Sequence, residues 1–235
     1  MTPRQKNKNL FLNSLSDENR DLLVRRSVPI QLPVPTDLYK ADEVPQFAYF
    51  VYSGMASVVT EMVDGGSAEV GMLGREGIVG ALHVLGPLAS PAHCFMQLGG
   101  DGLRIPMGEL RSLFHSSEEI RGRLLVLVQK DAMVLSQIAG CHRLHGAEER
   151  MARWLLMAQD QTQTDVLEFT QEFLANMLGS RRATVTVVAG TLQRAGLIEH
   201  RRKSVRVLDR ERLEAAACDC YRVIREIRGD IYRVP

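Results

Sequence analysis

Apolar residues near the start of the chain recur at helical spacing. Across residues 10–25, Leu15, Leu22 and Leu23 fall on one face, and Ser16 is placed to cap a helix with its hydroxyl group. We therefore expect one helix over this stretch.

From Val28 to about Ile105 the hydrophobic period shortens to two. Runs such as FAYFVY, ASVVTEMV and AEVGML are separated by Ser-Gly, Asp-Gly-Gly and Gly-Arg-Glu-Gly, a pattern typical of compact antiparallel β-structure. Pro29, Pro33 and Pro35 limit the opening run to an edge strand or irregular chain, because proline cannot donate to a ladder. This region is expected to form a small β-barrel or β-roll.

Helical periodicity then returns in three segments. PMGELRSLFHS predicts a short helix, and residues 117–144, which contain no proline, predict a long one. Its apolar positions are Ile120, Leu124, Leu127, Val128, Val134, Leu135, Ile138 and Cys141. This stripe is wider than one packing face needs, so the helix is expected to pack against a second copy as well, although Asp131 disfavours a plain coiled coil. Residues 147–159 predict a third helix, with Met151, Trp154, Leu155 and Ala158 on its core face.

The segment FTQEFLANMLGSRRATVTVVAGTLQRAGLI has the spacing of a helix-turn-helix. Thr170 is placed to cap the first helix, Gly179 falls at the turn, and Ser180 is placed to cap the second helix. Leu174, Ala175 and Leu178, and then Val185 and Val188, occupy the positions that must be apolar or small where two helices cross. The sequence therefore predicts a DNA-binding motif.

Burial of Val185, Val188 and Leu192 turns the opposite face of the second helix outward. That face carries Arg181, Arg182, Thr184, Thr186 and Val187. Arginine at a helix N-terminus opposes the helix dipole, but it suits a helix that enters a major groove, where arginine contacts guanine. The alternative for either arginine is a contact to phosphate or water.

Two short alternating runs, 198–200 and 205–208, follow this helix and are joined by Arg201, Arg202 and Lys203. A basic hairpin at this place indicates a wing that contacts phosphates, the alternative being an ordinary solvated turn.

The charge distribution supports this interpretation. The chain has a formal net charge of +1, yet residues 170–235 contain 13 lysines and arginines against 8 aspartates and glutamates. No apolar run approaches the roughly 18–20 residues needed to span a bilayer, and the first residues do not resemble a signal peptide, so we expect a cytoplasmic protein with no membrane partner. The 4 cysteines do not form a secretory disulfide framework.

In this order of elements the chain resembles the Crp/Fnr family of bacterial transcription regulators, most closely in the helix-turn-helix segment, in YFVYSGMASVV and in GREGIVGALHVLG. The resemblance implies an α+β fold: an antiparallel, cyclic-nucleotide-binding-like β-roll, a long dimerisation helix and a winged helix-turn-helix. The expected boundaries are 1–116 for the β-roll with its flanking helices, 117–144 for the dimerisation helix, 145–212 for the DNA-binding domain and 213–235 for a helical tail.

The resemblance further implies a homodimer that binds a two-fold symmetric promoter site on double-stranded DNA, with RNA polymerase as a partner. It places Arg182 at the family's base-reading arginine, and Thr170 and Glu172 where family members touch phosphates. Ala183 stands where the family's glutamate would accept a hydrogen bond from cytosine, and Val187 replaces a second reading arginine. We therefore expect an operator that differs from the family's best-known one.

The region that binds the effector in this family also departs from the family pattern. Its counterparts here are Gly80, Ala81, Leu82, Ser90 and Ala92. Ala81 replaces the carboxylate that holds the ribose, and Ser90-Pro91-Ala92 lacks the arginine that holds the cyclic phosphate. We expect no response to cyclic AMP in the usual mode, and the effector, if there is one, is left open. The cysteine cluster found near the N-terminus of iron–sulfur members is absent, since the first cysteine is Cys94.

Several histidines and cysteines are candidate metal, redox or haem ligands, and each also has a purely structural explanation. His142 and His145 are spaced to share a metal, and Cys218 and Cys220 to form half a metal site or a redox pair. The two histidines lie at the junction between the long helix and the DNA-binding domain, where such residues more often pack or cap a helix end. Cysteines two apart point to different helical faces, so we expect no metal and no cofactor. A redox-, haem- or metal-sensing regulator of the same fold stays open as an alternative, with His83 or His93 as haem ligands.

Enzyme motifs are missing from the sequence: it contains no phosphate loop, Gly-x-Ser-x-Gly or His-Glu-x-x-His. We expect a protein that is not an enzyme. A non-DNA-binding interaction adaptor is the remaining alternative, and it would not need the basic residues aligned on one face.

Overall fold

A computed structural model of the chain describes residues 8–63, 65–169, 171–201 and 203–229. The chain forms two compact units. Of the described residues, the first contains 8–57, 73–132 and 228–229, and the second contains 58–63, 65–72, 133–169, 171–201 and 203–227.

The start of the chain forms two helices where one was expected. α1 spans Leu10–Asn13 and α2 spans Asp17–Arg25. Ser16 does cap α2, accepting a hydrogen bond from the Asn19 N–H at 3.4 Å. The single-helix prediction is wrong because α1 has its own N-cap: the buried Asn9 accepts from the Leu12 N–H at 3.1 Å and donates to the carbonyls of Val51 and Gly77.

The strands confirm the antiparallel β-structure expected from the alternating runs. They are β1 (Val28–Leu32), β2 (Asp37–Tyr39), β3 (Phe47–Val51), β4 (Met55–Glu61), β5 (Ser67–Leu73), β6 (His93–Leu98) and β7 (Gly100–Pro106). One sheet has the order β1-β7-β3 and the other β2-β6-β4-β5. β1 lies at a sheet edge, as Pro29 requires, and Pro29 pairs with Leu103 of β7.

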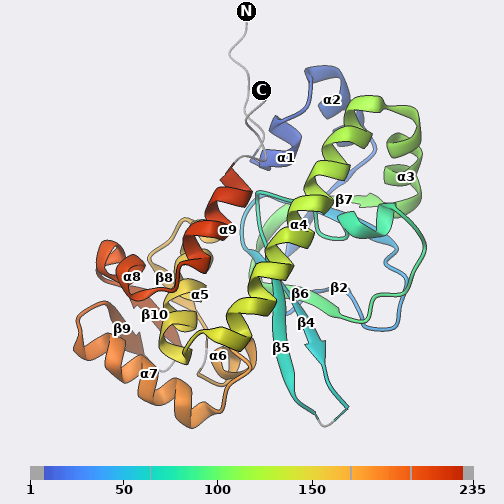
Figure 1. The fold of residues 1–235 in the computed structure, drawn as a ribbon. Helices are drawn as coiled ribbons and strands as arrows, with labels where there is room; N and C mark the ends of the chain where they lie inside the picture. Colours follow the sequence, from blue (N-terminus) through green and yellow to red (C-terminus); the bar gives the residue numbers. More distant parts are fainter. Residues whose placement is uncertain (1–7, 64, 170, 202, 230–235) are drawn as a thin grey trace, which may run out of the picture. The chain divides into compact units, whose positions relative to one another are not determined.

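Three helical segments lie between these strands or directly after them. The short 3₁₀ helix η1 spans Ala81–Val84, α3 spans Met107–Ser116, and α4 spans Glu118–Leu144 (Figure 1). The two predicted α-helices are therefore confirmed. Ile120, Leu124 and Leu127 of α4 join the buried core of the first unit. Leu135, which was assigned to the buried stripe, is instead 43% exposed.

α4 is long and apolar enough to cross a membrane by length and composition, with a mean hydropathy of 1.4 in its most apolar window. The helix passes this test although it contains no uninterrupted apolar run of that length. Only 28% of that window is buried. The exposed apolar side chains on α4 are Leu125, Val126, Met133, Leu135 and Leu144. This helix presents an apolar surface that the chain itself does not cover.

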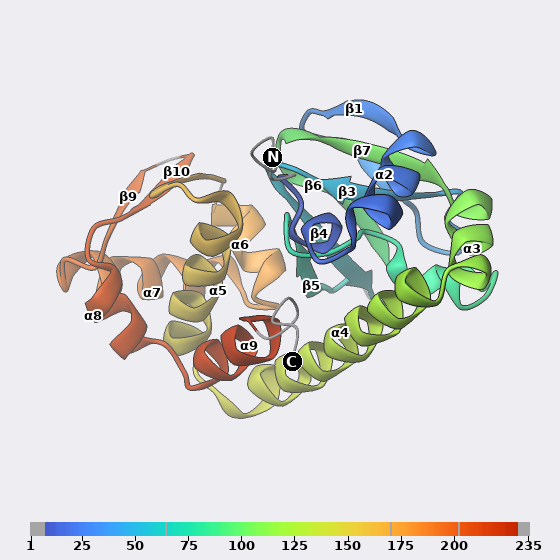
Figure 2. The ribbon, with the colours of Figure 1, turned by 90° about the horizontal axis from the view of Figure 1, so that it is seen from above.

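The second unit contains the rest of the helices and the smallest sheet (Figure 2). Besides the end of α4 and most of β4 and β5, its elements are α5 (Ala147–Thr162), β8 (Val166–Glu168), α6 (Gln171–Met177), α7 (Arg182–Arg194), β9 (Ile198–Arg201), β10 (Ser204–Val207), α8 (Arg210–Ala216) and most of α9 (Cys220–Gly229). The sheet has the order β8-β10-β9. All four predicted core residues of α5, including Trp154, are buried.

Candidate nucleic-acid interface

The turn between α6 and α7 depends on Gly179. Its φ of +54° lies in the left-handed region, which side chains other than glycine rarely adopt. The Gly179 N–H donates to the Asn176 carbonyl at 3.1 Å, and the Ser180 N–H donates to the Ala175 carbonyl at 2.9 Å. These two bonds form a Schellman motif, which ends α6 and redirects the chain into α7.

α7 has one buried face and one exposed face, as its periodicity predicts. Val185, Val188 and Leu192 are buried. Arg181, Arg182, Thr184, Thr186 and Val187 are all exposed, Val187 to 66%. The helix contains no acidic residue, and among the described residues no hydrogen bond or ion pair engages the Arg181 side chain, whose carbonyl accepts from the Val185 N–H. The outward face of α7 is therefore cationic at its N-terminus and apolar one turn further on.

The N-terminus of α7 differs from the prediction. Arg181, and not Ser180, is the N-cap residue, and no side chain caps the helix. The Ser180 hydroxyl is used elsewhere: it accepts from Arg150 Nη2 and donates to the Leu178 carbonyl, each at 3.2 Å. The amide N–H groups of the first turn of α7 therefore have no capping side chain, and such groups bind phosphate oxygens well.

Arg150, on α5, is a functional residue that sequence reasoning missed. Its Nη1 donates to the Leu178 carbonyl at 3.0 Å while Nη2 holds Ser180, so one guanidinium group fixes the turn before α7. Its place in the sequence, among the polar residues of an amphipathic helix, gave no signal of this role.

The predicted wing is present. β9 and β10 pair antiparallel, with Val205 opposite His200, and the His200 N–H donates to Gln193 Oε1 of α7 at 2.8 Å. Arg201 and Lys203 are exposed at its end. Arg201 forms an exposed ion pair with Glu199 at 2.8 Å, which is too weak to prevent Arg201 from turning to a phosphate.

Three of the proposed contact residues lie outside what the structure describes: Thr170 and Arg202 entirely, and the side chain of Glu172. Arg206 was not predicted but is exposed on β10 between buried Val205 and Val207. The alternation of the strand was the signal that could have found it.

A buried aromatic cluster holds α5 against α6. The Trp154 ring packs edge-on against Phe169, with ring centroids 5.0 Å apart, and 6.0 Å from Phe173. Arg210 of α8 donates to Gln159 and forms a 2.7 Å ion pair with Asp160 at the end of α5. These contacts give α7 and the wing a rigid support.

The residues assigned to the effector region have structural roles. Gly80 has a φ of +85°, and a Cβ atom there would lie 3.2 Å from the Phe47 carbonyl oxygen. Ala81, Ser90 and Ala92 are buried, and the Ser90 hydroxyl bonds with the backbone of Ala92, while Leu82 is 59% exposed. Their role in binding an effector stays a prediction.

The two candidate haem ligands each have a partner in the protein. His83 packs edge-on against Tyr39 with ring centroids 5.6 Å apart, and burial lowers its pKa. His93 Nε2 lies 2.7 Å from Asp37 Oδ1.

One sequence argument about the cysteines is wrong. α9 begins at Cys220, so Cys218 precedes the helix and the two thiols are not confined to opposite helical faces. Both lie beside Cys141 and His145, whereas His142 is not part of this cluster.

Part of the second unit matches a known domain family. Residues 149–216, which run from α5 to α8, match the family model of the Crp-like helix-turn-helix domain. We call this segment, which resembles that family, the Crp-like domain. In the Crp-like domain, α6 and α7 form the helix-turn-helix and β9 and β10 form the hairpin that follows it.

Solved structures extend the likeness beyond the Crp-like domain. A Crp/Fnr family transcriptional regulator from Eubacterium rectale is 18% identical, with a TM-score of 0.70 over 90% of this chain and 99% of that one. The c-di-GMP responsive global regulator CLP of Xanthomonas campestris is 20% identical, with a TM-score of 0.67 over 83% and 100%. A CRP family regulator from Thermus thermophilus is 18% identical, with a TM-score of 0.67 over 81% and 96%.

The chain therefore has the fold of Crp/Fnr regulators, a cyclic-nucleotide-binding-like β-roll followed by a Crp-like domain, and the resemblance seen in the sequence is confirmed. No curated protein sequence matches it.

Proposed function

We propose that this protein is a homodimeric, sequence-specific DNA-binding transcription regulator that acts in the cytoplasm on a two-fold symmetric promoter site. The observation that carries the proposal is the exposed face of α7. Arg181, Arg182, Thr184 and Val187 point outward from a helix without acidic residues, and the wing with Arg201 and Lys203 follows directly. Helix and wing match the arrangement in which one element reads bases and the other contacts phosphates.

The N-terminal turn of α7 enters the major groove in this proposal. Arg182 donates to a guanine, while Val187 offers apolar contact to a thymine methyl group. Thr170, Glu172, Ser180 and the uncapped amides of α7 lie at the phosphate backbone. Arg201, Arg202 and Lys203 add phosphate contacts that position the domain without selecting sequence.

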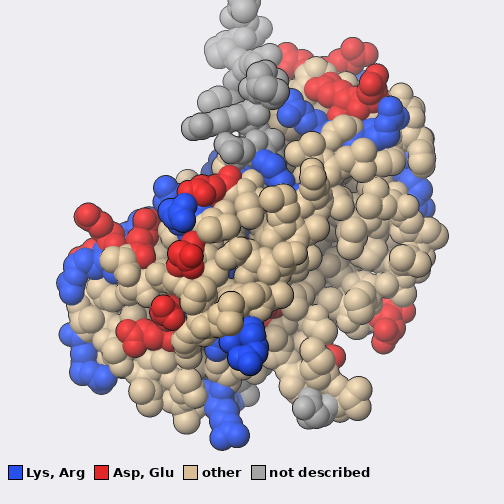
Figure 3. Space-filling model, in the orientation of Figure 1, with Lys and Arg blue, Asp and Glu red and all other residues tan. Residues whose placement is uncertain are grey.

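α4 is the proposed dimerisation element. Leu125, Val126, Met133 and Leu135 are each at least 40% exposed, and Figure 3 shows the middle of this helix with few charged side chains. From Ala132 to Cys141 the helix contains no charged residue. A helix that leaves this much apolar surface in water needs a partner, and the same face of a second copy is self-complementary.

The β-roll is proposed to sense a ligand other than cyclic AMP in its usual mode. Ala81 supplies no carboxylate to a ribose, and Ser90-Pro91-Ala92 supplies no cation to a cyclic phosphate. α4 would transmit the signal by setting the spacing of the two DNA-binding domains, since half-sites about 34 Å apart demand a fixed separation. RNA polymerase is the further partner that the resemblance implies.

The deciding experiment is selection of operator sequences from random DNA by the full chain, followed by fluorescence anisotropy against salt. We expect log Kd to rise linearly with log salt concentration, and the selected site to bind about 10³-fold or more tighter than random DNA. Arg181→Ala/Arg182→Ala should abolish this preference, whereas Arg222→Ala/Arg225→Ala, an equal loss of two charges on the exposed side of α9, should keep it. Absence of salt-dependent binding, or equal affinity for selected and random DNA, would contradict the proposal.

The dimer and the effector have their own tests. Light scattering should give twice the chain mass for the wild type, and Met133→Glu should shift it toward the monomer. Cyclic AMP and cyclic di-GMP, the latter taken from the name of the Xanthomonas relative, are the probes for the β-roll. We expect cyclic AMP to leave operator affinity unchanged, and a tenfold gain would contradict this part of the proposal.

A further inference from the structure

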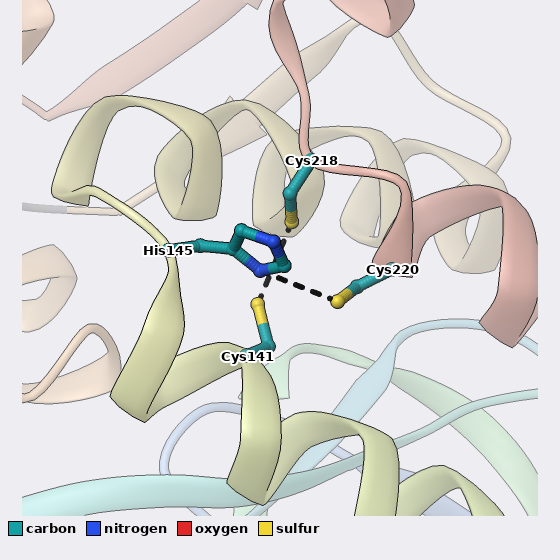
Figure 4. A group of neighbouring side chains, drawn as sticks. All are labelled: Cys141, His145, Cys218 and Cys220. Atoms are coloured by element: carbon teal, nitrogen blue, oxygen red, sulfur yellow. Dashed lines mark hydrogen bonds between the residues drawn. The ribbon is translucent and has the colours of Figure 1, made fainter.

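Four potential metal ligands from distant parts of the sequence meet within the second unit. Cys141 lies on the last turns of α4 and His145 directly follows that helix, where its N–H donates to the Cys141 carbonyl at 3.1 Å. Cys218 lies between α8 and α9, and Cys220 is the first residue of α9. Their side chains point toward one another (Figure 4), and all four ligand atoms lie within 4.8 Å of each other.

The distances match a tetrahedral site. The Sγ atoms of Cys141 and Cys218 are 3.5 Å apart, as are Cys220 Sγ and His145 Nδ1. Zinc–sulfur bonds of about 2.3 Å and zinc–nitrogen bonds of about 2.0–2.1 Å place the ligand atoms of a tetrahedron roughly 3.5–3.8 Å apart. All four cysteines of the chain are free thiols.

The surroundings of these four residues are those of a metal site. His145 directs Nδ1 toward the sulfurs and places Nε2 3.6 Å from Asp219 Oδ1. A metal-binding histidine in proteins usually has such a carboxylate on its other nitrogen, which fixes its tautomer. Gln137 Nε2 donates to Cys220 Sγ at 3.1 Å and holds this side chain in place.

A buried cation next to the cluster provides an independent observation. Arg153 is only 3% exposed, its Nε has no hydrogen-bond partner, and its Nη1 reaches Met157 Sδ at 3.2 Å. No carboxylate among the described residues forms an ion pair with it. Arg153 lies within electrostatic range of Cys141 and Cys218. A buried guanidinium without a carboxylate needs a compensating negative charge.

We infer that Cys141, His145, Cys218 and Cys220 bind one Zn²⁺ ion, which ties the segment between α8 and α9 to the end of α4. Three thiolates and a neutral imidazole around a divalent cation carry a net charge of −1, which Arg153 balances. On binding, the three thiols release their protons and His145 coordinates through Nδ1. Four protein ligands close the tetrahedron, so the ion has a structural role and leaves no position for a substrate.

The test begins with the wild-type chain, purified without an affinity tag from zinc-supplemented medium. We expect one zinc per chain by elemental mass spectrometry, released in full by an organic mercurial that blocks thiols. Cobalt reconstitution should give the intense d–d absorption of a tetrahedral site together with thiolate charge-transfer bands. Neither measurement depends on a variant that folds.

Variants then assign the ligands. Cys218→Ser and Cys220→Ser should each lose most of the zinc, and Asp219→Asn should weaken zinc binding by about 10–100-fold. Cys94→Ala is the matched control, because Cys94 is equally buried but belongs to β6, and it should keep one zinc per chain.

Three results would overturn the inference: substoichiometric zinc in the wild type with no tetrahedral cobalt spectrum, unchanged zinc content in Cys218→Ser, or a Cys141–Cys218 disulfide in the freshly purified protein.

Discussion

Trp154 Nε1 on α5 donates a 2.7 Å hydrogen bond to Glu69 Oε1 on β5. Both side chains are buried, at 1% and 7% exposure, so this bond joins the β4–β5 hairpin to the support of the helix-turn-helix within the second unit.

Glu69→Ala should lower the free energy of unfolding by about 1.5–3 kcal/mol, because it leaves the buried indole N–H without its charged acceptor. Urea denaturation followed by tryptophan fluorescence measures this change. Glu69→Gln retains an oxygen acceptor and should recover most of the loss. Equal stability of Glu69→Ala and wild type would show that the bond contributes nothing.

Arg182→Ala should relax sequence preference at one base pair of each half-site and cost about 1–3 kcal/mol of specific affinity. Lys203→Ala should instead weaken binding to all sequences equally and reduce the salt slope by about 1. Anisotropy titrations on selected and random DNA distinguish the two patterns. If Arg182→Ala loses affinity equally on both, Arg182 contacts phosphate and does not read a base.

Ala183→Glu should change the operator. A carboxylate at this exposed position accepts a hydrogen bond from cytosine N4, whereas the alanine methyl group cannot. Selection from random DNA should then show new preference for a cytosine at one position of each half-site. Ala183→Gln, which has the same size without the charge, is the control, and an unchanged operator would place residue 183 away from the bases.

Gly179→Ala should destabilise the second unit by about 1–2 kcal/mol, because the left-handed conformation at φ +54° is unfavourable for a residue with a Cβ atom. Gly190→Ala within α7 is the matched control. Its added Cβ meets only the flexible end of Arg194, and alanine is the better helix former by about 1 kcal/mol. Thermal unfolding of both variants should therefore shift in opposite directions.

Asp131→Asn should stabilise the protein at neutral pH. Burial raises the pKa of Asp131 to about 6, and Glu76 adds to this effect while Arg228 opposes it. Because the folded state holds this proton more tightly than the unfolded chain does, the wild type loses stability as pH rises from about 4 to about 6.

The asparagine variant lacks that loss, so its advantage should grow over the same interval and level off at about 1–3 kcal/mol. Urea unfolding at pH 4, 5, 6 and 7 measures the trend. Glu76 and Arg228 form a 3.2 Å ion pair beside the site, so Glu76→Gln should alter the midpoint. A pH-independent difference would contradict the assigned cause.

The hydrophobic periodicity predicted which residues of a helix are buried and which are exposed, and the prolines predicted an edge strand. The burial of Val185, Val188 and Leu192 and the exposure of Arg181 follow from helical spacing, and the edge position of β1 follows from Pro29. The resemblance in the helix-turn-helix segment added the functional meaning of those positions.

Long-range contacts could not be read in the same way. Asn9, which caps the start of α1, is held by carbonyls 42 and 68 residues away, and Ser180 is diverted from capping by Arg150, 30 residues earlier. Cys141 and Cys218 are separated by 77 residues, so their spacing in the sequence gave no sign that their thiols meet.

The missing cap on α7 would also couple DNA binding to the opening of the first turn of this helix. In the proposed complex the amide groups at the start of this helix bind the phosphate backbone, and ligand at 100 times its Kd adds about 2.7 kcal/mol to the stability of the form that binds it. Without DNA, we expect the uncapped first turn of α7 to open more readily than the rest of the helix. Amide exchange at Arg182 and Ala183 would then report promoter occupancy directly.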